Sequence, residues 1–365
     1  MTDAGIVCDA SGFLPPLPLL ESTLMPEHVT IVGDGAMATV CSILLTQGGH
    51  GVTMWGAFEE SIDRLLQDRE QTRLLPGVKV PGNVRLTAND ADCFRDATLI
   101  LSAIPTQYMR SSWRRLSPFV PPGVPIVSVA KGIENGTLLR PTQVIADVLS
   151  ATQGWTGKSR SLAAISGPNI AGELARYLPG TAVAASDDDA LAQRVQNTLS
   201  TEWFRVYTNP DLIGVELAGA TKNVIAIAAG IIDGLAAGNN AKAALVTRGL
   251  VEITRLGVAM GARAETFIGL AGLGDLVTTC VSPEGRNRTV GERIGKGQKL
   301  EDILASMDSV AEGVPTTRSV MELARRHGVE MPITEAVHHV LFDDKDVLRA
   351  LSDLMRREPK PELRQ

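Results

Sequence analysis

Short runs of β-branched and apolar residues recur through the first half of the chain, and stretches of helical character lie between most of them. The runs cover residues 28–32, 52–55, 98–102, 125–129, 162–165 and 181–185. Continuous apolar strands that alternate with helices are typical of a parallel sheet whose two faces are both covered. We therefore expect an α/β fold built on a Rossmann-like, doubly wound sheet.

The pattern changes after about residue 208, where the strand-like runs stop. One apolar helix rich in small residues is expected from Gly214 to Leu235. Further helices are expected at 241–260, 287–296, 300–307, 313–328, 332–343 and 345–356. The chain has 365 residues, which suits about two domains.

We accordingly expect a domain organisation in four parts. These are an N-terminal arm at 1–27, an α/β domain at 28–208, an all-helical domain at 209–356 and a tail at 357–365. A cleft between two such domains is a natural site for a small ligand.

Composition argues against several classes of protein. Asp and Glu outnumber Lys and Arg by 41 to 35, which gives a net charge of -6. No nucleic-acid partner is expected, because binding to a phosphate backbone needs a broad basic surface. The cysteines have no paired spacing, which argues against a disulfide scaffold or a zinc cage and favours a reducing, cytoplasmic location. They are Cys8, Cys41, Cys93 and Cys280.

Metals and membranes are not expected either. The five histidines show no metal-ligand spacing with nearby acids. Every apolar window of about 18 residues contains a charge or a turn breaker, so no membrane span is expected. The first residues lack the basic region of a signal peptide.

A glycine-rich loop follows the first strand-like run. Residues 33–38 read GDGAMA and fit the pattern G-x-G-x-x-[GA] that binds a dinucleotide. Gly33 permits a tight turn, Gly35 lets the backbone approach a pyrophosphate, and Ala38 lets helix and strand pack closely. The helix that begins here supplies N–H donors to the anion. The alternative is an ordinary tight turn between a strand and a helix.

The second strand-like run ends without the acid that usually holds the adenosine ribose. Residues 55–60 read WGAFEE, so Glu59 and Glu60 come slightly late, and no Arg is present to bind a 2′-phosphate. Both NAD(H) and NADP(H) remain open as cofactors, and the sequence favours NAD(H).

Lys222 is the only charged residue within 217–232, which reads LAGATKNVIAIAAGII. No carboxylate lies three or four positions away to pair with it on the helix. Such a lysine either extends to solvent or is buried with a lowered pKa, and a buried lysine of this kind can serve as a general base or nucleophile. Asn223 beside it is suited to orienting a ligand.

Residues 269–288 form a second glycine-rich segment, which contains Asp275 and then Arg286 and Asn287. A guanidinium fork matches phosphate oxygens, an amide can add an N–H donor, and a helix that begins here adds its dipole. The alternative is a pair of solvated arginines at a helix start.

Lys131 and the segment 166–169 follow two further strand-like runs. They are expected at the carboxyl edge of the sheet, where open α/β folds bind ligands. Each alone is more often a plain turn.

Taken in this order, these segments resemble the NAD(P)-dependent glycerol-3-phosphate dehydrogenase family. The resemblance runs from about His28 to about Phe342 and is densest at 166–171, 204–233, 269–288 and 311–314. It implies reversible hydride transfer between NAD(P)H and dihydroxyacetone phosphate. The product, sn-glycerol 3-phosphate, is the head-group precursor of glycerophospholipids.

The resemblance also implies roles for individual residues. Lys222 corresponds to the general acid/base, and Asp275 lies beside the reacting end. The implied substrate contacts are Lys131, Gly167, Asn169, Lys222, Asn223, Asp275, Gly285, Arg286 and Asn287. The implied cofactor contacts are Gly33, Gly35, Ala36, Met37, Lys131, Ala171, Arg286, Val310 and Glu312.

The chain departs from the usual family pattern at Met37, Ala38, Ala57, Asn169 and Gly285. Two other interpretations stay open: a dinucleotide-binding sensor without turnover, and a related two-domain dehydrogenase that acts on another hydroxy acid or phosphosugar. The small apolar residues of the helical part also allow a homodimer.

Overall fold

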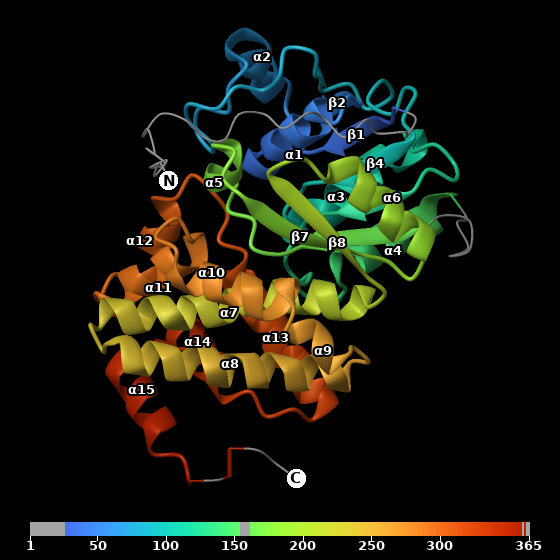
Figure 1. Ribbon diagram of the computed structural model, residues 1–365. Coiled ribbons are helices and arrows are strands. Elements are labelled where there is room, and N and C mark those ends of the chain that lie inside the picture. Colours follow the sequence, from blue (N-terminus) through green and yellow to red (C-terminus); the bar gives the residue numbers. More distant parts are fainter. Residues whose placement is uncertain (1–25, 154–160, 360, 363–365) are drawn as a thin grey trace, which may run out of the picture.

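The computed structural model describes residues 26–153, 161–359 and 361–362. Most of the predicted arm therefore lies outside the described residues. The described chain forms an upper part built on a sheet and a lower part built of helices (Figure 1). The expected Rossmann-like sheet followed by an all-helical part is confirmed.

Eight strands form one sheet in the order β3-β2-β1-β4-β5-β6-β7-β8. They are β1 (His28–Val32), β2 (Gly51–Trp55), β3 (Arg85–Thr87), β4 (Leu99–Ser102), β5 (Ile126–Ser128), β6 (Leu162–Ser166), β7 (Gly180–Ala185) and β8 (Phe204–Asn209). Two of them, β3 and β8, were not expected as strands. The first has only three residues, and the second alternates buried with exposed side chains at the edge of the sheet.

The expectation of a wholly parallel sheet is wrong at one place. Strand β7 pairs antiparallel with β6, and β8 is parallel to β7. The connection from β6 to β7 contains only the five-residue helix α5 (Ala171–Ala175). A parallel return needs a longer crossover, usually with a full helix, so β7 starts at the edge where β6 ends.

Helices cover both faces of the sheet. In this part of the chain they are α1 (Ala36–Gln47), α2 (Glu59–Asp68), α3 (Thr106–Leu116), the 3-10 turn η1 (Ser117–Phe119), α4 (Pro141–Gln153), α5 and α6 (Asp189–Leu199). Strands β1, β4 and β6 carry almost unbroken buried runs, as expected for strands packed on both sides.

The helical part is built around α7 (Leu212–Gly234), whose side chains are almost all buried. The other helices are α8 (Asn239–Ala259), α9 (Ala264–Phe267), the π-helix η2 (Leu270–Gly274), α10 (Asp275–Val281), α11 (Arg286–Gly295), α12 (Leu300–Ala305), α13 (Gly313–His327), α14 (Pro332–Phe342) and α15 (Val347–Met355). A helix that is apolar on every side belongs in a core, and α7 runs beside α8 through the middle of this part (Figure 1).

Glycines allow α7 and α11 to approach very closely. A Cβ atom at Gly291 of α11 would lie 1.9 Å from the carbonyl oxygen of Ile227, and one at Gly230 of α7 would lie 2.0 Å from the carbonyl oxygen of Arg288. No side chain fits at either position, so the backbones pack directly against each other. This contact presses the first turn of α11, with Arg286 and Asn287, against the helix that carries Lys222.

The core of the helical part continues onto the sheet. Ala164 of β6 and Val183 of β7 belong to the same buried cluster as the apolar side chains of α7. The helix therefore lies across the end of the sheet. Side chains of α7 thereby face the loops at the carboxyl ends of the strands.

Two helical stretches are long and apolar enough to cross a membrane by length and composition, Leu212–Gly234 and Ala264–Val281. The apolar window of the first is entirely buried inside the folded chain, and that of the second is 39% buried. Both contain charged residues, among them Lys222 in the first and Asp275 in the second.

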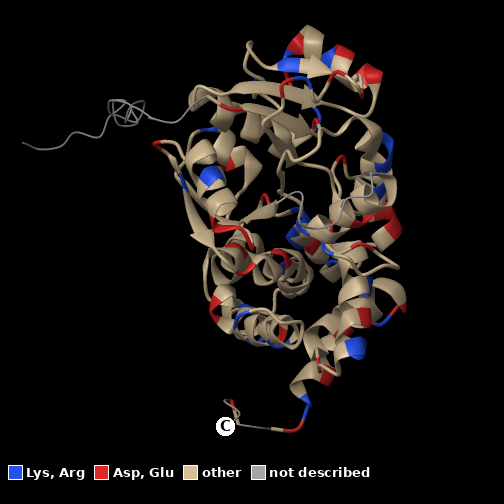
Figure 2. Cartoon of the chain, turned by 90° about the vertical axis from the view of Figure 1, so that its right-hand side faces the viewer, with Lys and Arg blue, Asp and Glu red and all other residues tan. Residues whose placement is uncertain are grey.

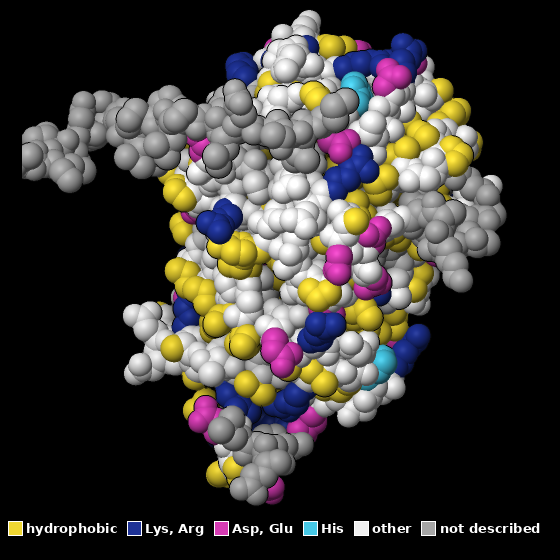
Figure 3. All heavy atoms as spheres, turned by 45° about the vertical axis from the view of Figure 1, so that its right-hand side comes forward, with side chains coloured by type: hydrophobic (Ala, Val, Ile, Leu, Met, Phe, Trp, Pro, Cys, Tyr) yellow, Lys and Arg dark blue, Asp and Glu magenta, His cyan; other side chains and the backbone are white. Residues whose placement is uncertain are grey.

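Positive and negative side chains are interspersed over both parts of the chain (Figure 2). The face shown in Figure 3 likewise mixes Lys and Arg with Asp, Glu and hydrophobic side chains. The face shown in Figure 3 is thus not the broad basic surface that nucleic-acid binding requires.

Candidate active site

A single buried carboxylate joins two lysines between the sheet and the helical part. Oδ1 of Asp275 lies 2.9 Å from Nζ of Lys222, and Oδ2 lies 2.7 Å from Nζ of Lys131. The exposed fractions of the Asp275 and Lys222 side chains are only 4% and 6%. Two cations and one anion thus share a nearly dry site.

Three distant segments bring these groups together. Lys222 lies in the middle of α7, Lys131 follows β5, and Asp275 is the first residue of α10. The π-helix η2 precedes α10, and its Gly272 packs against the backbone of Phe267 so tightly that a Cβ atom would lie 2.0 Å from the Phe267 carbonyl oxygen. That close turn directs Asp275 into the buried space next to α7.

Burial lowers the pKa of Lys222 below its usual value, while the Asp275 carboxylate opposes the shift and Lys131 adds to it. A lysine of lowered pKa exchanges its proton more readily near neutral pH than an exposed lysine does. Of the two alternatives for Lys222, burial is the one observed, and extension to solvent is not.

Lys131 is held from both sides. Its Nζ donates to the carbonyl oxygen of Gly167 at 2.9 Å as well as to Asp275. The side-chain amide of Asn223, next to Lys222 on α7, donates to the Lys131 carbonyl oxygen at 3.0 Å. Lys131 and Gly167, both predicted at the sheet edge, therefore lie next to Asn223 and Lys222 of α7.

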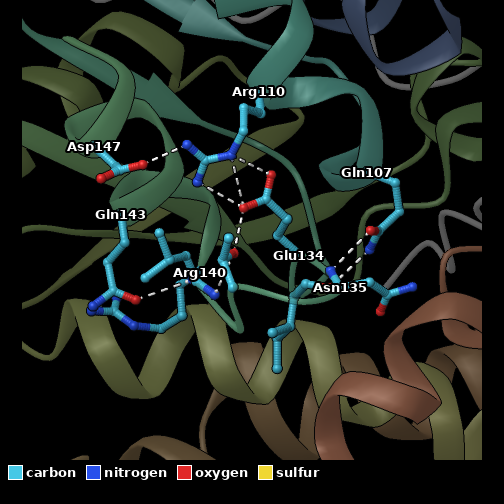
Figure 4. Close-up of polar contacts among 10 residues, drawn as sticks. Gln107, Arg110, Glu134, Asn135, Arg140, Gln143 and Asp147 are labelled. Atoms are coloured by element: carbon cyan, nitrogen blue, oxygen red, sulfur yellow. Dashed lines mark hydrogen bonds and ion pairs between the residues drawn. The ribbon is translucent and has the colours of Figure 1, made fainter. Parts of the chain in front are cut away.

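The loop after Lys131 is fixed by a polar network (Figure 4). Glu134 is buried and accepts a forked contact from Arg110 of α3, whose Nε lies 2.9 Å from Oε1 and whose Nη2 lies 2.8 Å from Oε2. Arg110 also pairs with Asp147 of α4. Gln107 of α3 donates to the Ile133 carbonyl oxygen at 2.8 Å. The loop that carries Lys131 thus has little freedom to move.

The same loop is tied to the helical part through Glu216. This glutamate of α7 accepts the backbone N–H of Thr142 at 2.8 Å and the Thr142 hydroxyl at 2.7 Å, and it pairs with Arg140. Helix α4 begins with Pro141, and the backbone N–H of Thr142 in its first turn finds its acceptor in Glu216, far along the chain. Glu216 therefore works as a cap across the two parts.

Arg286 and Asn287 open α11 as expected. The Asn287 amide oxygen accepts the backbone N–H of Gly313 at 2.9 Å, which leaves its NH₂ group available to a ligand. Arg286 reaches the Val310 carbonyl oxygen at 3.3 Å. A Cβ atom at Gly313 would lie 2.7 Å from the Asn223 carbonyl oxygen and 2.8 Å from the Asn287 amide oxygen, so Asn287 lies close to the Lys222 site.

Gly285 is the N-cap residue of α11 and has no side chain to cap it. Gly167 has φ +139°, and a Cβ atom there would lie 2.9 Å from the Thr181 carbonyl oxygen. The Asn169 amide is best satisfied with its NH₂ group 3.0 Å from the Pro168 oxygen and 2.9 Å from the Thr181 oxygen. Its NH₂ group is thereby committed to the backbone.

The glycine loop has the expected strand–loop–helix setting. Gly33 has φ +127°, and a Cβ atom there would lie 2.8 Å from the Ala103 carbonyl oxygen, so only glycine fits. Gly35 is the N-cap of α1, and no side chain caps the first turn of that helix, which contains Ala36 and Met37. The backbone N–H groups of this turn are therefore able to bind an anion.

Buried hydroxyls without partners line the same region. Within the described residues, Thr106, Ser166 and Thr316 have no hydrogen-bond partner for their hydroxyl oxygens. A Cβ atom at Gly132 would lie 2.7 Å from the Thr106 hydroxyl oxygen and 3.3 Å from that of Thr316, so these two hydroxyls are neighbours. Such groups usually find a partner, and here a bound polar ligand can supply it. The residues gathered here therefore fit a dinucleotide and a small polar substrate.

Several residues at the site were missed in the sequence analysis. Thr106 and Thr316 carry no motif, and Glu216 lies in an apolar helix far from its partner, whereas Ser166 belongs to the predicted segment 166–169. Residues 55–60 contain no Arg, but an arginine from another segment lies at the end of β2, because Arg115 of α3 donates to the Ala57 carbonyl oxygen at 2.8 Å. Glu312, expected near the cofactor, accepts the backbone N–H of Thr106 at 2.6 Å.

The histidines need one correction. His338, His339 and Asp343 have ligand atoms within 4.8 Å of one another, although no metal-ligand spacing was expected. The two rings lie in the last turn of α14, and Asp343 is its C-cap residue. His339 Nδ1 lies 2.7 Å from Asp343 Oδ2, which is a hydrogen bond between a helical residue and the residue that ends the helix.

Comparisons with known proteins agree with this geometry. The family models for the N-terminus and the C-terminus of NAD-dependent glycerol-3-phosphate dehydrogenase match residues 28–192 and 211–352. The chain is 45% identical to glycerol-3-phosphate dehydrogenase [NAD(P)+] 2 of Salinibacter ruber, over 93% of this chain and 97% of that one. It is also 45% identical to glycerol-3-phosphate dehydrogenase [NAD(P)+] of Streptomyces coelicolor, over 93% and 99% of the two chains.

The crystal structure of glycerol-3-phosphate dehydrogenase from Coxiella burnetii superposes with a TM-score of 0.85 at 34% identity, over 91% of this chain and 99% of that one.

Proposed function

This chain belongs to the NAD-dependent glycerol-3-phosphate dehydrogenase family, and on that premise we propose how its own residues carry out the reaction. The enzyme is an NAD(P)-dependent oxidoreductase that interconverts dihydroxyacetone phosphate and sn-glycerol 3-phosphate. The bound nicotinamide supplies the hydride or accepts it. The product would serve glycerophospholipid synthesis.

Lys222 transfers the proton. In ketone reduction its ammonium group donates a proton to the carbonyl oxygen as the alkoxide develops, and in alcohol oxidation its neutral amine removes that proton. The observation that carries this proposal is the buried contact between Lys222 and Asp275, together with the lowered pKa of the lysine.

Asp275 and Lys131 set the charge of the site. The Asp275 carboxylate stabilises the charged form of Lys222. Lys131 adds a second cation near the developing oxyanion. Asn223 holds the backbone of Lys131 and orients that cation. The two lysines leave a net positive charge where negative charge develops.

Arg286 and Asn287 bind the substrate phosphate at the start of α11. The free NH₂ group of Asn287 and the guanidinium of Arg286 supply donors, and the uncapped first turn at Gly285 supplies backbone N–H groups. Fixing the phosphate orients the carbonyl toward Lys222. Gly167 and Asn169 close the substrate site at the end of β6.

A bound dinucleotide would be held at the carboxyl edge of the sheet. Gly33, Gly35, Ala36 and Met37 would contact its pyrophosphate. Two other segments would border it: the start of α5, with Ala171, and the residues just before α13, with Val310 and Glu312.

The test is loss of absorbance at 340 nm when dihydroxyacetone phosphate is added to the purified protein, run with NADH and with NADPH. Oxidation of either cofactor by the wild type, and its loss in Lys222→Met, is the expected result. Dinucleotide binding without oxidation would favour a sensor. Oxidation driven only by non-phosphorylated ketones would favour a different dehydrogenase.

A homodimer in the cytoplasm is also proposed. Large apolar side chains stay exposed on the helical part at Leu273, Val277 and Val281, four residues apart along η2 and α10. This row can support contact with a second copy, which sedimentation of the wild type and of Val277→Asp would test.

Free thiols among the described residues, such as Cys41, suit a reducing compartment, and cell fractionation tests the location.

A further inference from the structure

The carboxylate of Asp34 lies at the end of β2, although Asp34 belongs to the loop after β1. A Cβ atom at Gly56, the residue after β2, would lie 2.9 Å from Oδ2 of Asp34. Gly33 of the same loop donates its backbone N–H to the Trp55 carbonyl oxygen at 2.8 Å. The two loops are thus in direct contact, and the missing side chain at Gly56 leaves room for the carboxylate.

Asp34 is held in this position by two residues that follow β2, one at the start of α2 and one just after its end. The hydroxyl of Ser61, in the first turn of α2, donates to Oδ2 of Asp34 at 2.5 Å. The side-chain amide of Gln71 donates to the Asp34 carbonyl oxygen at 2.7 Å. Both the backbone and the carboxylate are therefore oriented before any ligand binds.

In dinucleotide-binding folds, the end of the second strand is where an acid accepts the ribose hydroxyl. Gly56 and Ala57 occupy this place in the present chain and offer no acid. Asp34 supplies a carboxylate at the same place from the neighbouring loop. The sequence pattern did not identify this carboxylate, because the acid is expected after β2 and Asp34 lies in the loop after β1.

The charges around Asp34 do not favour an additional phosphate. Among the described residues no Lys or Arg side chain bonds to the Asp34 carboxylate, whose side-chain partner is the Ser61 hydroxyl. Arg115 is the cation at the strand end, but it is paired with Asp90 at 2.7 Å.

We propose that Asp34 is the specificity-determining residue that makes this enzyme select NADH over NADPH. Its carboxylate accepts a hydrogen bond from the 2′-hydroxyl of the adenosine ribose and repels a 2′-phosphate at that position. This inference rests on the proposed function, because it assumes that a nicotinamide dinucleotide is the redox cofactor.

The experiment is calorimetric titration of the purified full chain with two probes, ADP-ribose and its 2′-phosphate. The variants are Asp34→Asn, which keeps size and shape, and Asp34→Ala, with folding verified by circular dichroism. Glu60→Gln is the matched control, because it removes an exposed carboxylate from the same helix start. Oxidation of NADH on adding dihydroxyacetone phosphate is measured in parallel.

The wild type is expected to bind ADP-ribose at least about a hundredfold more tightly than its 2′-phosphate, as like charges in contact predict. Both Asp34 variants should reduce that ratio at least about tenfold, since a charge-assisted hydrogen bond and a repulsion are both removed, while Glu60→Gln leaves it unchanged.

Equal binding of the two probes by the wild type overturns the inference, as does an unchanged ratio in both Asp34 variants. A changed ratio without dihydroxyacetone phosphate-dependent oxidation supports the role of Asp34 and removes the proposed reaction. Failure of both probes to bind overturns the inference and the cofactor assignment together.

Discussion

Nζ of Lys222 lies 2.9 Å from Oδ1 of Asp275, and both side chains are almost completely buried. The partner of the lysine comes from a helix start far along the chain. The carboxylate also binds Lys131 through its second oxygen. A proton donor held in this way is protected from solvent and fixed in direction before the substrate arrives.

Replacing Lys222 by Met should separate activity from stability. We expect kcat to fall at least about a hundredfold, the usual effect of losing a general acid. The melting temperature should stay the same or rise, because burial of the lysine disfavours its charged form while Asp275 keeps Lys131 as a partner. Steady-state kinetics and thermal unfolding measure the two effects. Lys296→Met, at an exposed helix position, is the control, and near-normal turnover of Lys222→Met would remove the lysine from the mechanism.

The pH dependence of the reaction should follow Lys222. Ketone reduction needs its ammonium form, so the rate falls as pH rises through the pKa of Lys222, whereas alcohol oxidation rises there. Asp275 opposes the lowering of that pKa, so Asp275→Asn should move both limbs to lower pH.

Profiles of kcat/KM against pH in both directions measure this shift. Asp233→Asn, which removes a paired carboxylate near the far end of the same helix, is the matched control. Limbs that do not move, or that move to higher pH, contradict the assignment.

Asn287→Asp should act on substrate binding. The new carboxylate can still accept the Gly313 N–H, so local structure is retained, but the NH₂ donor is lost and a negative charge faces the phosphate. Losing a hydrogen bond to a charged group should raise KM for dihydroxyacetone phosphate about tenfold to a hundredfold. The value of kcat should change much less. Asn239→Asp, exposed at the start of α8, serves as control, and an unchanged KM would place the phosphate elsewhere.

Glu216→Ala should destabilise the fold. It leaves the Arg140 guanidinium buried without its anion and the Thr142 N–H without an acceptor. Breaking a buried pair in this way lowers the free energy of unfolding by about 3–5 kcal/mol.

Urea unfolding monitored by fluorescence gives the value. The double variant with Arg140→Met should recover part of the loss, because no buried charge is left unpaired. Glu322→Ala removes an exposed helix pair and should cost about 0.5 kcal/mol or less. A loss in Glu216→Ala as small as this would mean that the cap contributes little.

The strand and helix pattern was readable from the sequence because it depends on neighbours along the chain. The β-branched run at 28–32, the glycine loop at 33–38 and the apolar stretch around Lys222 each form the expected element. Glycine at position 33 has a local reason, since only glycine takes φ +127° there. Lys222 was identified for the same kind of reason, as a lone charge among apolar residues.

Only the tertiary structure decided which of these elements meet. The reversal of β7 follows from the short connection after β6, and the contact of Asp34 with Gly56 follows from the packing of two loops. The capping of α4 by Glu216 and the pairing of Asp275 with Lys222 join segments far apart in sequence. Periodicity and propensity act over a few residues, whereas charge pairing in a buried site depends on how whole helices pack. The sequence thus determined the parts and the chemistry they carry, and packing determined which charges share the site.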